Sequence, residues 1–236
     1  MQELLISITA SAKQTMQAQA VNANNLANAS TDGFKSEITY YSGRESAGEI
    51  ASSPDLSAGV IRTTGRSLDV AINGNGWFAV LDANGEEAYT RRGDLQVDSF
   101  GQLTNGIGQL LMGNNGPIAL PPFGAVEIAT DGTISILPIG QSPNTLAIVD
   151  RIKLVVLDNE KLYRSEDGLM RLPEFEVADP DASVSLVSGA LEGSNVNVVA
   201  EMVKMIELAR RFEGEIQLMQ SAKENSEALA KIMSMS

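Results

Sequence analysis

The 236-residue sequence contains no histidine and no cysteine. Without histidine there can be no Ser-His-Asp or Cys-His catalysis, no imidazole metal site and no histidine pH switch. Without cysteine there can be no thiol nucleophile, zinc-thiolate site or disulfide. Carboxylates, hydroxyls, lysine, arginine and tyrosine remain for chemistry. We therefore expect no catalytic residues, no metal site and no cofactor, and a function other than that of an enzyme.

Basic residues are also scarce, because 17 lysines and arginines face 30 acidic residues and leave a net charge of −13. Phosphate contacts need a surplus of positive charge, so a nucleic-acid partner is excluded. Attachment to an anionic membrane surface is disfavoured for the same reason. Aromatic residues make up only 5% of the chain, although 43% hydrophobic residues suffice for a buried core.

Long apolar runs are missing near the N-terminus. The stretch Leu4–Ile6 is too short for the core of a secretory signal or for a membrane span. Glu3 precedes it, and the first basic residue is Lys13. We expect no membrane insertion, and a chain that stays in the cytosol or leaves by a route that reads no Sec signal.

The first segment, residues 3–29, has the spacing of an amphipathic helix. Apolar residues recur every three or four positions and end at the turn signal 30–33. We assign residues 1–35 to this N-terminal helix and its exit. The apolar face, which we predict to be an assembly face, consists of Leu5, Ile8, Ala12, Met16, Ala20, Ala23 and Ala27.

The middle of the chain has a different pattern. All eight prolines and most glycines lie within 36–190. Short β-type runs such as 68–72, 77–81 and 133–137 alternate with glycine-rich turns, which is typical of an all-β domain. We expect a linker or extended arm at 36–64 and an all-β outer domain at 65–190.

The last segment, residues 195–233, returns to a helical pattern. Ser194 or Asn195 is the expected N-cap, and residues 191–236 form the predicted C-terminal helical part. The stripe is long enough for a coiled-coil seam. Its apolar assembly face is predicted to consist of Val199, Met202, Ile206, Ala209, Phe212, Ile216, Met219, Leu229 and Ile232.

The order helix, β-domain, helix predicts an α+β fold with an inserted all-β domain. Two terminal amphipathic helices can bury their stripes against each other, as a coiled-coil-like inner domain, or against copies in neighbouring subunits. The first helix face is mostly alanine, which suits close helix packing better than independent folding.

One match to a cofactor-binding motif is not supported by the residues that follow it. Gly74, Gly76 and Ala79 match the dinucleotide fingerprint literally. That fingerprint requires a helix after the last glycine, whereas 77–81 has the composition of a strand. A turn between two strands explains these glycines better.

Three stretches, at 24–35, 67–78 with 89–94, and 189–197, resemble the axial proteins of the bacterial flagellum, the rod and hook subunits. The first reads NNLANASTDGFK, the second begins SLDVAINGNGWF and continues YTRRGD, and the third reads GALEGSNVN. The signature positions are Asn24, Asn25, Leu26, Ala27, Asn28, Gly33, Phe34, Gly74, Gly76, Ser194 and Asn195.

The resemblance implies a structural subunit of the flagellar basal body, and within the family it favours the proximal rod. Members of the family place their terminal helices in an inner tube and assemble helically into a drive shaft that transmits torque and encloses the export channel. The implied partners are copies of the chain, other proximal and distal rod proteins and the type III export apparatus. The implied location is the periplasmic rod, reached without a Sec signal, and no small-molecule substrate is expected.

Two other functions remain open at this point. A distal-rod or hook-type axial subunit would show much the same signatures. A soluble adaptor that presents a β-domain on a coiled-coil stalk would show the same order of helices and strands, but would form a discrete oligomer.

Overall fold

The computed structural model describes residues 2–42, 49–141, 145–158, 161–165, 167–173 and 176–233. The chain divides into two compact units. Unit 1 comprises residues 1–29, 36–55 and 196–236, and unit 2 comprises residues 30–35 and 56–195. The α+β class is confirmed by two long helices and many antiparallel strands.

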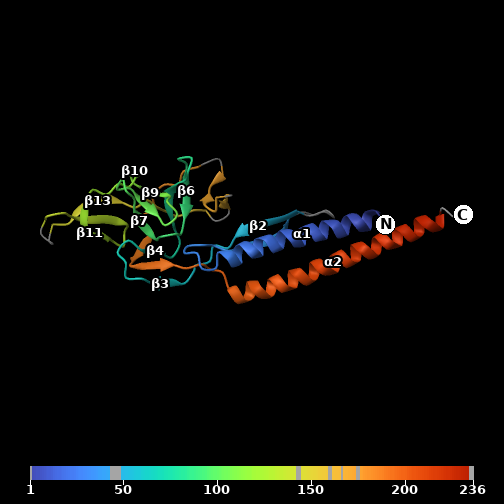
Figure 1. The fold of residues 1–236 in the computed structure, drawn as a ribbon. Helices are drawn as coiled ribbons and strands as arrows, with labels where there is room; N and C mark the ends of the chain where they lie inside the picture. The colour runs from blue at the N-terminus through green and yellow to red at the C-terminus, as the bar shows by residue number, and fades with distance from the viewer. Residues whose placement is uncertain are drawn as a thin grey trace. The chain divides into compact units, whose positions relative to one another are not determined.

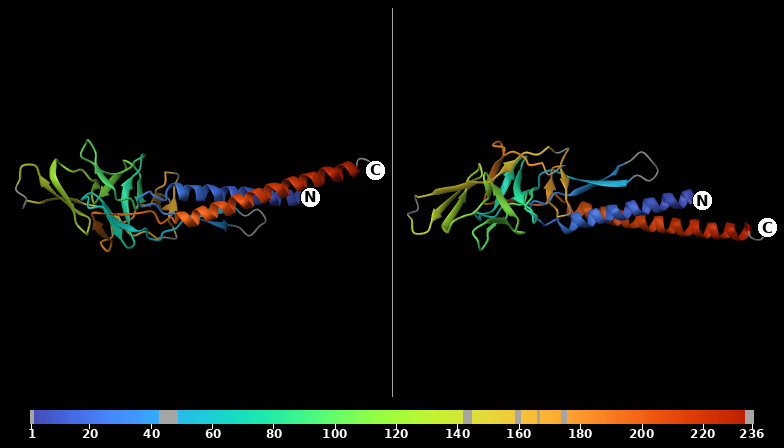
Figure 2. Two further views of the ribbon diagram at one scale, coloured as in Figure 1. Left: turned by 60° about the horizontal axis from the view of Figure 1, so that its bottom comes forward. Right: turned by 90° about the horizontal axis from the view of Figure 1, so that it is seen from above.

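Unit 1 consists of two helices and a hairpin: α1 (Gln2–Ala27), β1 (Glu37–Ser42), β2 (Glu49–Pro54) and α2 (Val198–Met233). The helices pack against each other and lie side by side in Figure 1 and in the right view of Figure 2. They are antiparallel, because Thr9 contacts Met219 whereas Asn22, further along α1, contacts Glu201. The hairpin β1–β2 also packs on α1.

The ends of α2 and α1 show how side chains cap them. The Oδ1 atom of Asn197 accepts a hydrogen bond from the Ala200 amide at 3.1 Å, which makes Asn197 the N-cap of α2. The expectation of Ser194 or Asn195 as the cap is therefore wrong, because the helix begins at Val198. At the end of α1, the Asn28 side chain donates to the Asn24 carbonyl at 3.0 Å.

Unit 2 is built from strands. Its first eight are β3 (Ile61–Thr63), β4 (Val70–Asn73), β5 (Trp77–Leu81), β6 (Glu87–Thr90), β7 (Leu95–Val97), β8 (Leu103–Asn105), β9 (Leu110–Gly113) and β10 (Gly116–Pro117). The other eight are β11 (Phe123–Ile128), β12 (Thr133–Pro138), β13 (Ala147–Arg151), β14 (Leu154–Val155), β15 (Tyr163–Arg164), β16 (Met170–Arg171), β17 (Ser185–Ser188) and β18 (Ala190–Glu192).

The largest sheet runs in the order β15-β16-β6-β5-β9-β8-β7, with β14 also paired to β5. Strand β5 is central and buried on both faces. Phe78 and Val80 point into one apolar cluster, and Trp77 and Ala79 into the other. Smaller sheets, β11-β12-β13, β17-β4 and β18-β3, complete the unit.

The segment 36–64, expected as a linker or extended arm, contains three strands. Of these, β1 and β2 belong to unit 1 and β3 to unit 2, where it pairs with β18. Residues 30–35 and 191–195 pack with unit 2 rather than with the helices that they adjoin.

Candidate assembly surfaces and the signature junction

The seam between α1 and α2 has a heptad spacing on each helix. On α2 one series of buried and half-buried residues alternates at intervals of four and three. They are Glu201, Met205, Leu208, Phe212, Glu215, Met219 and Ala222. On α1 the matching series includes Ile8, Ser11, Thr15, Ala18, Asn22 and Asn25. This is the a/d spacing of two helices packed along their length.

Many seam residues are polar. The Glu215 carboxylate is buried, and its Oε1 atom accepts hydrogen bonds from Ser11 Oγ at 2.6 Å and Thr15 Oγ1 at 3.1 Å. Arg211 Nε donates to the same oxygen at 3.2 Å. Further along, Asn22, which is fully buried, donates to the Glu201 carbonyl at 3.1 Å and to its carboxylate.

The structure buries only part of the apolar face that was predicted for the N-terminal helix. Ala12 is buried, and Leu5 and Ile8 are half-buried. The rest of that face, Met16, Ala20, Ala23 and Ala27, is exposed. Thr15, Ala18 and Asn22 are buried instead, so the buried side of α1 is rotated from the apolar stripe toward polar and small residues.

The apolar face that was predicted for the C-terminal helix is also only partly buried. Phe212 and Met219 are half-buried, and the side chains of Leu229 and Ile232 lie outside the described residues. The remaining five residues are exposed: Val199, Met202, Ile206, Ala209 and Ile216. Val199 is 71% exposed and Ile206 55%. We call these five residues the open stripe of α2.

In unit 2 the family signatures converge on one buried carboxylate, that of Glu192 in β18. Lys35 Nζ lies 2.7 Å from its Oε1 atom and Arg91 Nη1 lies 3.0 Å from its Oε2 atom. The Gly59 amide donates to Oε1 at 2.9 Å. The side chains of Lys35 and Glu192 are each 1% exposed, so these charges are sequestered from water. We call Lys35, Arg91 and Glu192 the signature junction.

The junction also connects to the glycine-rich turn before β5. Arg91 Nη2 donates to the Gly74 carbonyl at 2.8 Å, and its guanidinium lies 5.3 Å from the centre of the Trp77 ring. Burial lowers the pKa of Arg91 from its ordinary value, and the adjacent Glu192 acts in the opposite direction. The Gly74–Gly76 turn is thus part of a structural anchor and not of a nucleotide site.

The remaining signature residues act locally. Asn25 is fully buried in unit 1, where its amide donates to the Glu37 carbonyl at 2.9 Å and accepts from the Glu37 amide at 2.8 Å. It therefore fixes the start of β1. Asn195 donates to the Ser57 carbonyl at 3.2 Å, and the Phe34 ring lies 4.6 Å below the Arg164 guanidinium. Asn24 is exposed, whereas Leu26 and Ser194 are half-buried.

Two glycines in these segments allow close backbone approach. Gly33 has a φ of 71°, and a Cβ atom there would lie 2.5 Å from the Arg91 carbonyl carbon. A Cβ atom at Gly93 would lie 1.8 Å from the Val70 carbonyl oxygen. Neither position has room for a side chain. The chain segment after α1 can thus reach the β6 segment only because position 33 is glycine.

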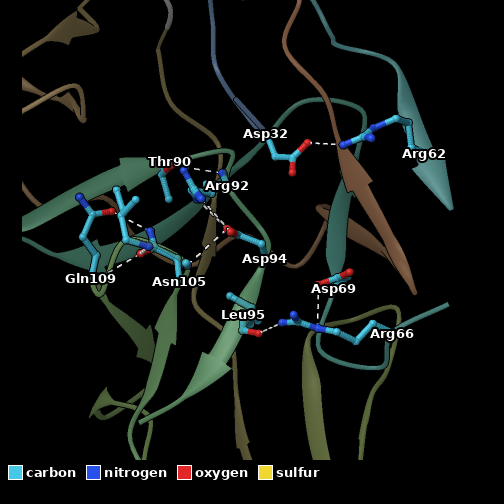
Figure 3. Close-up of polar contacts among 12 residues, drawn as sticks. Asp32, Arg62, Arg66, Asp69, Thr90, Arg92, Asp94, Leu95, Asn105 and Gln109 are labelled. Atoms are coloured by element: carbon cyan, nitrogen blue, oxygen red, sulfur yellow. Dashed lines mark hydrogen bonds and ion pairs between the residues drawn. The ribbon is translucent and has the colours of Figure 1, made fainter. Parts of the chain in front are cut away.

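More exposed ion pairs lie in and beside the same segments of unit 2 (Figure 3). Arg62 lies 2.6 Å from Asp32, and Arg66 lies 3.1 Å from Asp69 while also donating to the Leu95 carbonyl. Arg92 makes a two-point contact with Asp94 at 2.7 and 2.8 Å. Each of these pairs has at least one member in a signature segment, which agrees with a structural role for the signatures.

Within the described residues, no group of three acidic side chains has the arrangement of a metal site. Among those residues, neither helix is both long and apolar enough to span a membrane. Sequence reasoning missed Lys35, Arg91 and Glu192 as a unit. The available signal was that each lies inside, or directly at the end of, a signature stretch.

Comparison with known proteins identifies the family. Residues 8–35 match the family described as flagella basal body rod protein, and residues 71–136 match the flagellar hook protein FlgE/F/G D1 domain. Residues 187–232 match the flagellar basal body rod FlgEFG protein C-terminal family. The flagellar basal-body rod proteins FlgF of Escherichia coli and Salmonella typhimurium are each 40% identical to the chain over the full length of both proteins.

The chain belongs to the flagellar basal-body rod proteins of the FlgF type. The rod protein FlgG of Buchnera aphidicola is less similar, at 32% identity over 85% of this chain and 90% of its own length. The predicted family and the predicted role as a structural rod subunit of the basal body, rather than an enzyme, are therefore confirmed.

Proposed function

We propose that the chain is a subunit of the proximal rod that assembles helically, through its terminal helices, into the drive shaft of the flagellum. Neighbours in this proposal are copies of the chain and other proximal and distal rod proteins. The assembled shaft transmits torque and encloses the export channel. Non-closing contacts between one surface and a different surface of the next subunit generate such helical assemblies.

The observation that carries the proposal is the open stripe of α2. Five residues at heptad-like spacing, Val199, Met202, Ile206, Ala209 and Ile216, are exposed beside a seam that α1 already occupies. A helix with two adjacent seams can pack against two other helices at once. Exposed apolar residues in such a row are typical of a protein–protein contact.

The exposed part of α1 suits the same assembly. Met16, Ala20, Ala23 and Ala27 are small or flexible side chains on a helix that has only Glu3 and Lys13 as charged residues. Small residues allow a neighbouring helix to approach closely. We infer that this face and the open stripe of α2 together form the coiled-coil-like inner domain of the assembled rod.

Export through the flagellar type III apparatus to the periplasm is part of the proposal. The sequence supports it in one respect: a chain without cysteine has no disulfide to reduce before passing unfolded through a narrow channel.

The first test is the structure of basal bodies from a strain that lacks this chain, with swimming in soft agar as the second readout. Loss of motility, with rods that stop before the distal section, is the expected result. Rods that extend into the distal section and end early there would favour the distal-rod alternative. Full-length rods in motile cells would contradict a rod function and leave the adaptor.

A substitution tests the open stripe directly. Ile206→Asp places a carboxylate where the apolar contact is proposed, so the variant should fail to restore motility although its fold is unchanged. Gln217→Asp is the matched control, because it adds the same charge at an exposed polar position of α2. Normal swimming with Ile206→Asp would show that the stripe is not an assembly surface.

A further inference from the structure

The α1–α2 seam places a carboxylate where packed helices usually have an apolar side chain. Glu215 stands at a seam position between Phe212 and Met219, and it is 7% exposed. Its Oε2 atom is buried and has no hydrogen-bond partner among the residues that the structure describes. A leucine there would avoid this desolvation cost, so stability alone does not account for the glutamate.

The contacts of Glu215 depend strongly on axial position. Ser11 and Thr15 lie one turn apart on α1, and both donate to the same oxygen of Glu215. The carboxylate is therefore held between two hydroxyls on successive turns. Asn22, which donates to Glu201, supplies a second polar contact nearer the other end of α1.

A slip of one heptad would remove the contacts of Glu215 with Ser11 and Thr15. In one direction Glu215 would come opposite positions 4 and 8, which are leucine and isoleucine and offer no donor. In the other direction it would come opposite Ala18 and Asn22, so that only Asn22 could donate to it, and Asn22 would lose Glu201. Arg211 lies on the same helix and would still donate to Glu215, but loss of the two hydroxyl donors would destabilise the slipped register.

We propose that Glu215 determines the axial register in which α2 packs on α1. Ser11 and Thr15 are the residues that recognise it, and Asn22 reinforces the same register. Polar residues at single seam positions fix register in paired helices at some cost in stability. The proposal goes beyond the rod function, because the register of α2 on α1 is a property of the single chain and does not depend on what the chain assembles into.

Register matters for the surfaces described above. A slip of one heptad moves α2 by about 10.5 Å along α1. The open stripe of α2 would then be displaced along the helix axis relative to the exposed face of α1, which consists of Met16, Ala20, Ala23 and Ala27. A neighbour that contacts both helices would meet a mismatched surface.

The register can be measured by thiol cross-linking, since the natural chain has no cysteine. Thr9→Cys with Met219→Cys reports the native register, because these side chains are in contact at 3.9 Å. Met16→Cys with Met219→Cys reports a slip of one heptad, since Met16 is seven residues from Thr9 on the same face. Thr9→Cys with Phe212→Cys reports the opposite slip. Each pair is treated with a short bis-maleimide in the purified full-length protein.

When Glu215 and the rest of the seam are unchanged, only the variant with Thr9→Cys and Met219→Cys should cross-link. Adding Glu215→Leu should raise the ratio of slipped to native product by about thirtyfold, as expected for the loss of two hydrogen bonds of about 1 kcal/mol each. Helix content, measured by circular dichroism, should not fall, because leucine suits a buried seam position.

Two matched variants separate register from packing. Glu215→Gln keeps an oxygen that accepts from Ser11 and Thr15, so the native product should still dominate. Leu208→Met changes an apolar seam residue and should leave the product ratio unchanged. Exclusive native product from Glu215→Leu would overturn the proposal. Failure of the Thr9–Met219 pair to cross-link with the native seam would overturn it as well, because the pairing itself would then be absent.

Discussion

The two units of the chain bury charge in different ways. In unit 2, Glu192 is surrounded by two cations and an amide, and the core around it is made of fully buried apolar side chains. In unit 1, Glu215 is only partly satisfied, and large apolar residues such as Met202 and Ile206 remain exposed. Unit 2 thus pairs both oxygens of its buried carboxylate with cations, whereas unit 1 leaves one oxygen of its buried carboxylate without a partner among the described residues. The comparison shows that a buried carboxylate can anchor a fold, as Glu192 does, or depend on one alignment of two helices, as Glu215 does.

The largest expected effect comes from breaking the signature junction. Glu192→Ala leaves Lys35 and Arg91 buried without their counter-ion, which should destabilise unit 2 by about 3–5 kcal/mol. Trp77 is the single tryptophan and lies against Arg91, so its fluorescence during urea unfolding reports this unit. Glu127→Ala, at an exposed position of β11, is the control and should change the free energy of unfolding by less than about 0.5 kcal/mol. Equal effects of the two variants would mean that the junction is not a structural anchor.

A smaller, pH-dependent effect is expected at the exposed carboxylate of Asp167. Burial raises its pKa, but hydrogen bonds from Arg171, Ser165 and the Leu169 amide outweigh burial and hold the pKa at about 2. The ionised form is thus favoured by folding. Asp167 therefore adds stability above its unfolded pKa near 4 and loses that contribution as the pH falls toward 2.

Asp167→Asn should accordingly cost at most about 1 kcal/mol at pH 7, because the ion pair is exposed to solvent. The difference between variant and natural chain should shrink to a small fraction of its value by about pH 2. Urea unfolding of both proteins at a series of pH values measures this. A difference that persists unchanged at pH 2 would contradict the assigned role of the carboxylate.

The smallest effect is expected at the open stripe. Ile206→Ala should change the free energy of unfolding by less than about 0.5 kcal/mol, because Ile206 is already 55% exposed. The same replacement at the buried Ile136 should cost about 2–5 kcal/mol. Urea unfolding of the two variants, followed by circular dichroism and by Trp77 fluorescence, compares them. A large loss of stability from Ile206→Ala would mean that the stripe is part of the fold of the single chain.

The sequence was sufficient to predict where the helices and several strands lie, but not how the helices are rotated. Spacing located α1, α2, β5 and β12 because a helix or strand imposes its period on apolar residues. The seam of α2 contains Glu201 and Glu215, which a search for apolar spacing passes over. The apolar stripe was therefore centred on Val199, Met202 and Ile206, which the structure leaves exposed.

The signature junction could not be predicted for a related reason. A lone lysine, arginine or glutamate in a sequence is expected to be exposed. Burial of Lys35 and Arg91 depends on Glu192, which is far away in the sequence. The resemblance to axial proteins identified the segments that matter, but only the fold shows that three of them meet at one carboxylate.

The separation of Lys35 and Glu192 in sequence has a consequence for the order of folding. Their ion pair closes a loop of 157 residues, so it is among the most non-local contacts within unit 2. A chain that emerges with its N-terminus first has to keep Lys35 solvated until almost all of the β-strands have followed. Non-local contacts of this kind form late and slowly. A truncated chain that ends before residue 192 should therefore lack the contact that closes unit 2, however many of its strands have already formed.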